Sequence, residues 1–235
     1  MSVKADRRAA WRASFAVGIA VSAYGVSFGA LAVASGLDLW QACVLSLVMF
    51  SGGSQFAVIG VLASGGVAAG PAAIAGATLL GLRNGLYAIR VAPIIGPGLL
   101  KRLAAGHFTI DESTAVATAQ PTLESQRVGF WATGGIIFIG WNLTTLLGAV
   151  LGDLIGDVRQ FGLDAAAGAA FLGLVWPRLK ALQPVVVAAG AAVVAAVLLP
   201  ALPLGVPVLV AALVAVGVGV PNLFATRPKA GEKSL

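Results

Sequence analysis

Apolar residues form blocks along the chain, separated by short polar or charged segments. A helix needs about 20 apolar residues to cross the hydrocarbon core of a bilayer. The blocks are 13–34, 39–63, 67–82, 86–100, 129–152, 162–176, 184–199 and 205–220. Three blocks are comfortably long, whereas five hold only 15 or 16 residues and either extend into their flanks or form half-helices that turn back. No block alternates polar and apolar residues as a barrel strand does. We therefore predict an all-α transmembrane bundle of six to eight spans and choose eight.

The composition supports a membrane protein. Of the 235 residues, 59% are apolar and only 10% are charged, against about 25% charged in ordinary soluble domains. A soluble or disordered chain would not carry this much apolar surface. We expect one transmembrane domain over residues 1–235, passing several times through the cytoplasmic (inner) membrane of the cell and surrounded by the lipid bilayer. The first block, with 22 residues, exceeds the roughly 7–15 residues of a signal-peptide core, so we expect it to be retained as a span.

Basic residues predict the orientation of the chain. With the N-terminus inside, twelve of the 15 Lys and Arg lie in the segments 1–12, 101–128 and 221–235 and in the loop before the seventh block. The outer loops hold three Asp and a single basic residue, Arg159. Cytoplasmic loops carry this excess of Lys and Arg in membrane proteins. We expect both termini and the loop 101–128, which separates two halves of four spans, in the cytoplasm, and we expect no nucleic-acid partner.

Two arginines, Arg83 and Arg90, stand in apolar surroundings. A guanidinium in hydrocarbon costs at least roughly 2.5–3.5 kcal/mol, so it normally faces a partner or a water-filled cavity. Arg83 is either a binding residue or a residue whose side chain reaches the membrane interface. We expect Gly85 to break the helix, which leaves Arg90 as a packing or interface residue.

The run Ser51-Gly52-Gly53-Ser54-Gln55 interrupts the block 39–63. Irregular backbone at this depth is tolerated only where protein or a watery cavity satisfies it. Transporters use such breaks to bind ions or zwitterions with helix ends and backbone groups. The alternative is a close helix contact between small residues. We favour binding, because packing does not need the polar side chain of Gln55.

Other polar and small residues have simpler explanations. Gly148, Gly152 and Gly156 form a small-residue ridge that is typical of helix packing. Asp164 opens an apolar block and either caps a helix, which we favour, or serves as a proton or ammonium site. The single cysteine, Cys43, excludes an internal disulfide. Titratable residues in the long polar loop lack metal-ligand spacing: His107, Asp111, Glu112 and Glu124. Without a catalytic constellation, we expect no enzyme, metal or cofactor.

Four short blocks of residues occur together in an order that points to a family. They are Phe50-Ser51-Gly52-Gly53-Ser54-Gln55-Phe56-Ala57; Leu82-Arg83-Asn84-Gly85-Leu86-Tyr87 with Pro93; Thr109-Ile110-Asp111-Glu112-Ser113; and Trp141 with Thr145, Gly148, Gly152 and Gly162-Leu163-Asp164. Over residues 10 to 220 the chain resembles the AzlC family, the large subunits of bacterial branched-chain amino-acid exporters. Two positions depart from the family pattern, since Gly81 stands where Asn is frequent and Asn84 where His is frequent.

The resemblance implies export of valine, leucine, isoleucine or analogues such as methionine, energised by the proton gradient. It also implies a small AzlD-like membrane subunit as partner. The candidate substrate-binding residues are Gly52, Gly53, Ser54, Gln55, Arg83, Asn84, Tyr87 and Asp164. A carboxylate would meet Arg83 or the helix ends near the glycines, and an ammonium would meet carbonyls at the break or Asp164. The charged pair Asp111-Glu112 either orders its loop, which we favour, or forms a gate contact.

Two other kinds of function stay open. A channel for a small neutral solute would need no coupling residue and would pass its solute downhill. An assembly subunit would hold no substrate site of its own, because the site would lie in its partner.

Overall fold

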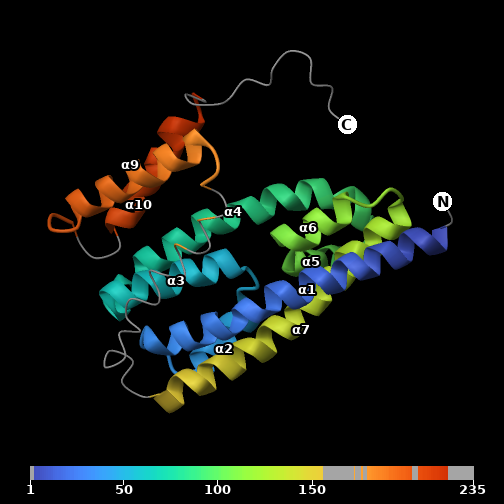
Figure 1. Ribbon diagram of the computed structural model, residues 1–235, viewed down its shortest axis with the longest axis horizontal. Coiled ribbons are helices and arrows are strands. Elements are labelled where there is room, and N and C mark those ends of the chain that lie inside the picture. The colour runs from blue at the N-terminus through green and yellow to red at the C-terminus, as the bar shows by residue number, and fades with distance from the viewer. Residues whose placement is uncertain (1–2, 156–171, 173–175, 177–178, 203–205, 222–235) are drawn as a thin grey trace. The chain divides into compact units, whose positions relative to one another are not determined.

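The computed structural model describes residues 3–155, 172, 176, 179–202 and 206–221, and the elements in this part of the chain are helices (Figure 1). The chain divides into two compact units, Met1–Ala167 and Gly168–Leu235. The first holds α1 (Val3–Ala34), α2 (Leu39–Val48), α3 (Gly52–Gly65), the 3-10 turn η1 (Val67–Ala69), α4 (Gly70–Ile95), α5 (Leu99–Phe108), α6 (Asp111–Thr118) and α7 (Leu123–Ile155). The second holds α9 (Leu182–Leu198) and α10 (Val206–Gly219), which pack on each other. The all-α class is confirmed for the described residues, and the single domain stays a prediction.

Within the described residues, three helical segments are long and apolar enough to cross a membrane: Lys4–Ala34, Val67–Ile95 and Leu123–Leu154. The 26 residues of α4 reach ~39 Å at about 1.5 Å per residue, more than the ~30 Å of a hydrocarbon core. The predicted spans 184–199 and 205–220 correspond to the shorter apolar helices α9 and α10. The span predicted at 162–176 lies almost entirely outside the described residues, and the count of eight spans is not confirmed.

The prediction of two spans at 67–82 and 86–100 is wrong, because most residues of both blocks lie in the continuous helix α4. Gly85 does not break it. One glycine costs only about 1 kcal/mol in a helix, whereas an interrupted ladder in lipid would leave several backbone groups without partners. The chain turns instead at Gly96 and Gly98, whose φ angles of 81° and 115° favour glycine.

The block 39–63 is not one crossing, because it folds back on itself as two short helices. Ser46 on α2 contacts Thr145, Phe50 at the tip contacts Phe138, and Ser54 on α3 then contacts Ala77 of α4. α3 runs antiparallel to α4 and ends at Gly65, beside the start of α4 (Figure 1). We call α2, the tip 49–51 and α3 hairpin A.

The predicted break in this block is confirmed, but its position differs slightly. The irregular residues are 49–51, and Gly52 and Gly53 are already the first residues of α3. α2 begins at a complete capping box, in which Asp38 accepts from the Gln41 N–H at 2.7 Å and Gln41 accepts from the Asp38 N–H at 3.0 Å. Because Gly52 and Gly53 lie within α3 and face Trp141 and Arg83, they serve close packing and are not part of the break.

The segment 101–128, which we predict as the cytoplasmic loop between two halves, is mostly helical. α5 and α6 form a second folded-back pair, which we call hairpin B with its tip at 109–110. Its apolar side packs against the end of α4 and the first half of α7 in a buried core of Val91, Ile94, Ile95, Ala105, Ala117 and Phe130. The charged residues of α5 had concealed this half-apolar helix in the sequence.

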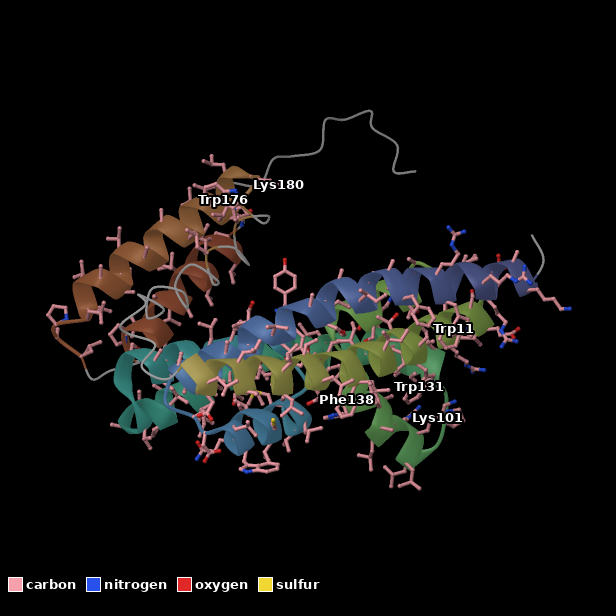
Figure 2. All side chains as sticks on the ribbon, turned by 60° about the horizontal axis from the view of Figure 1, so that its bottom comes forward. Trp11, Lys101, Trp131, Phe138, Trp176 and Lys180 are labelled. Carbon is pink, nitrogen blue, oxygen red and sulfur yellow. The ribbon has the colours of Figure 1, made fainter. Side chains whose placement is uncertain are left out.

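The two hairpins approach each other from opposite ends of the unit, and their tips meet near the middle of α7 (Figure 1). The Phe50 ring of hairpin A lies 5.7 Å from the His107 ring of hairpin B and 5.2 Å from the Phe138 ring of α7. In Figure 2, Trp131 and Lys101 lie toward the end at which α1 and α7 begin, and Phe138 lies farther along α7. Both breaks thus fall at mid-depth of the long helices.

α1 and α7 run parallel and form the closest helix contact of the unit. Their starts are joined by an Arg7–Glu124 ion pair at 3.3 Å, and Thr133 donates to the Ser14 hydroxyl at 2.9 Å farther along. A side chain at Gly148 would collide with the Val26 backbone, and one at Gly152 would lie 3.1 Å from Ala30. The predicted packing role of this ridge is confirmed for Gly148 and Gly152, and Gly156 lies outside the described residues.

We expect Gly148→Ala to destabilise the protein, because its Cβ would push α1 and α7 apart at the Val26 backbone. Overpacking of this kind typically costs about 1–3 kcal/mol. The matched control is Gly135→Ala on the same helix, where a Cβ would meet nothing within 4 Å. Thermal unfolding in detergent measures the difference, and equal melting temperatures for the two variants would contradict the packing role.

The charge-based orientation makes a second prediction. α4 ends where α7 begins, since Arg127 donates to the Ile94 carbonyl at 2.8 Å, so hairpin B lies at the same end as the N-terminal part of α1. With that end in the cytoplasm, an impermeant thiol reagent added outside intact cells should label a cysteine at Asp38 and miss one at Lys101. Cys43→Ala supplies the background. Labelling at position 101 from outside would reverse the orientation.

Candidate functional site

A cavity of about 250 Å³ lies where the tips of the two hairpins meet α4. Hairpin A contributes Val48, Met49, Phe50, Ser51 and Ser54; α4 contributes Ala77, Thr78, Gly81 and Asn84; hairpin B contributes Gly106, His107 and Thr109. Sites for drug-sized ligands measure roughly 300–1,000 Å³. The volume therefore suits a smaller solute, of the size of one amino acid.

The first turn of α3 is fixed against α4 by buried hydroxyls. Ser51 donates to the Ser54 hydroxyl at 3.2 Å, and Ser54 donates to the Ala77 carbonyl at 3.1 Å. Gln55 is fully buried, donates to the Ser46 carbonyl at 3.4 Å and leaves its Oε1 without a partner. No side chain caps the start of α3, so the backbone N–H groups of this turn keep their partial positive charge.

Arg83 lies against this turn and is paired with a residue of hairpin B. A Cβ on Gly53 would come within 2.7 Å of the Arg83 Nη2, so any larger residue would make the guanidinium shift. The same Nη2 lies 3.1 Å from Oδ2 of Asp111, the first residue of α6. Both side chains are about 30% exposed. The Arg83 Nε and the Asp111 Oδ1 are buried and without partners.

The other predicted site residues are divided. Asn84 lines the cavity, and its Oδ1 is buried without a partner. Tyr87 lies one turn farther along α4, is half-buried and is not among the residues that line the cavity in the described part of the chain. Gly52 faces the Trp141 indole, where a Cβ would be 3.1 Å from Cη2. Asp164 lies outside the described residues.

The sequence did not single out the hairpin B residues at this site. His107 and Thr109 line the cavity, and Asp111 pairs with Arg83. The ion pair of Asp111 joins α6 to α4, so this carboxylate does more than order its own segment. The signal for hairpin B is weak, because Ala105 is the described α5 residue that is buried in the core.

Four helix ends meet at the cavity, two of each polarity. α3 and α6 begin there, and α2 and α5 end there. Helix starts attract carboxylates, and the carbonyls of helix ends attract ammonium groups. Among the described residues no cluster of three or more His, Cys, Asp or Glu could hold a metal ion. Arg83 lies beside the first turn of α3, but it is not among the described residues that line the cavity.

The family model described as AzlC protein matches residues 16–155, which is more than half of the chain and includes both hairpins. No curated protein and no solved structure matches the chain. The chain therefore belongs to the AzlC family, a family of membrane transporters.

Proposed function

We propose that this protein is a secondary transporter that exports branched-chain amino acids, namely valine, leucine, isoleucine and analogues such as methionine. The proton gradient drives the export, and the protein works in the cytoplasmic membrane as the large subunit beside a small AzlD-like partner. The observation that carries the proposal is the cavity between the hairpin tips, which offers separate partners for the two charges of an amino acid.

The acid group of the substrate meets Arg83 and the uncapped start of α3. A guanidinium presents two parallel N–H groups that match a carboxylate, and the helix start adds partial positive charge. Gly53 leaves the space in which both lie side by side. Together they favour an anionic group at this end of the cavity.

The ammonium group meets acceptors on the other side of the substrate. Asn84 offers an unpartnered Oδ1, and the ends of α2 and α5 offer backbone carbonyls. Val48, Met49 and Phe50 give the cavity an apolar side for an aliphatic side chain. Asp164 retains its alternative role as a proton or ammonium site.

Counterflow in vesicles tests the proposal. Vesicles that contain the protein and its small partner are loaded with unlabelled leucine and diluted into a trace of labelled leucine. A carrier accumulates the label transiently, valine and isoleucine compete, and lysine does not. A channel would only equilibrate the label. Absence of transport of any branched-chain amino acid, with and without the partner, would reject the proposal.

The partner is tested in the same vesicles. Transport by the large subunit alone would show that it holds its own substrate site. Transport that requires the small subunit, but is still abolished by changes in the cavity, would place the two proteins in one transporter.

A further inference from the structure

We infer that Asp111 competes with the carboxylate of the transported solute for Arg83. The inference deepens the proposed function by giving hairpin B a role in the substrate site, and it rests on that function only for the identity of the solute as an amino acid. Replacement of the Asp111 carboxylate at Arg83 requires only that the solute carry a carboxylate and reach Arg83.

The position of the ion pair supports the competition. Arg83 extends from α4 to the first turn of α3, and Asp111 approaches it from the tip of hairpin B. Asn84, the residue after Arg83, and Thr109, two residues before Asp111, line the cavity, whereas Arg83 and Asp111 are not among its described lining residues. The ion pair thus lies beside the cavity, and its two side chains are partly exposed.

The pair is incomplete as an arginine–carboxylate interaction. Arg83 and Asp111 form one contact at 3.1 Å, while the Arg83 Nε and the Asp111 Oδ1 are buried without partners. Such pairs commonly form two parallel hydrogen bonds, and buried polar atoms without partners are costly. Asp111 is held by the start of α6, whereas a free solute can turn until both of its oxygens face the guanidinium. Replacement therefore completes a second hydrogen bond.

Repulsion between carboxylates favours replacement over joint binding. The Asp111 carboxylate and that of the solute would both lie beside one guanidinium, whereas the ammonium of an amino acid meets acceptors on the other side of the substrate. We therefore expect the solute to displace Asp111. Displacement removes the ion pair that joins hairpin B to α4.

Equilibrium binding to the purified full-length protein tests the competition with three probes. Leucine carries both charges, 4-methylpentanoate carries only the carboxylate, and 3-methylbutylamine carries only the ammonium. Asp111→Asn should lower the Kd of leucine and of 4-methylpentanoate by about fivefold or more, the scale of one partly exposed ion pair. It should leave the Kd of 3-methylbutylamine unchanged or raise it. Glu112→Gln, the same loss of charge at the next residue, is the matched control and should change none of the three.

Weaker binding of both acids by Asp111→Asn would overturn the inference, and so would an equal gain for the amine. If Asn destabilises the protein, Asp111→Ser removes the carboxylate while retaining a residue suited to a helix start, and the same results are expected. Leucine counterflow without the gain in affinity would reject the inference and retain the proposed function. Stronger binding of 4-methylpentanoate without any amino-acid transport would do the reverse.

Discussion

Replacing Arg83 with alanine is expected to lower leucine export by about 30-fold or more, while the protein still inserts and accumulates. Loss of a hydrogen bond to a charged group costs about 1.5–3 kcal/mol, and 2 kcal/mol corresponds to roughly 30-fold. The substitution removes the cation beside the start of α3 and leaves the Asp111 carboxylate without its counter-ion. Leucine export from loaded cells, normalised to protein abundance, measures the effect.

Two further variants show which property of Arg83 matters. Lysine keeps the charge but lacks the planar pair of N–H groups that matches a carboxylate, so Arg83→Lys should restore only part of the export. Arg90→Ala is the control, because Arg90 lies two turns farther along α4 and is exposed. Normal export by Arg83→Ala would reduce Arg83 to an interface residue, and loss of export by Arg90→Ala would make the effect a general one of charge on α4.

Replacing Gly53 with valine is expected to reduce export about tenfold or more, since the new side chain would occupy the space of the Arg83 guanidinium. A Cβ at this position alone comes within 2.7 Å of Nη2, the end of a flexible side chain that can shift slightly. Gly53→Ala should therefore have a milder effect than Gly53→Val, whose branched side chain is too large for such a shift. Export and thermal unfolding are measured together.

The control for Gly53 is Gly85→Ala on the facing helix. Its Cβ would meet nothing within 4 Å, and Gly85 is not among the described residues that line the cavity, so export should stay within about twofold. Normal export by Gly53→Val would mean that Arg83 does not bind the substrate from its position beside α3. A large loss of thermal stability in the valine variant alone would assign the effect to folding instead.

The sequence predicted the break in the second apolar block, because Ser51, Gly52, Gly53 and Gln55 are residue types that a plain span does not need. It also predicted Arg83 as a candidate, because a guanidinium in an apolar block demands a partner. Asn84 and Ser54, which the resemblance and the break brought forward, line the cavity. In each case the residue type alone indicated a candidate site residue, without knowledge of its neighbours in the fold.

The positions at which helices end and the chain turns back could not be predicted in the same way. Gly85 was expected to end a helix, but membrane-spanning backbone continues wherever interruption would leave its groups without partners. The turning back of hairpin A was not predicted, because block 39–63 is long enough for one span and half-helices were an alternative only for the short blocks. Hairpin B was missed because Lys101 and Arg102 make α5 read as a polar loop, although its Ala105 is buried in the core.

The partner of Arg83 was the residue that sequence reasoning could least supply. Asp111 lies 28 positions away, and only the return of α5 and α6 toward the middle of α7 brings it to α4. The contact depends on all the residues that pack hairpin B against α4 and α7. The local pattern of charged residues, taken alone, favoured ordering of a loop.

Protection of introduced cysteines by leucine tests most directly whether the substrate binds between the hairpins. Thr78→Cys and His107→Cys, in a Cys43→Ala background, place thiols on opposite sides of the cavity, on α4 and on hairpin B. Leucine at about ten times its Kd should slow the alkylation of both thiols about tenfold. A thiol at the exposed Ser64, near the end of α3, should react at the same rate with and without leucine. If leucine is bound and transported but protects neither cavity cysteine, the substrate site lies elsewhere.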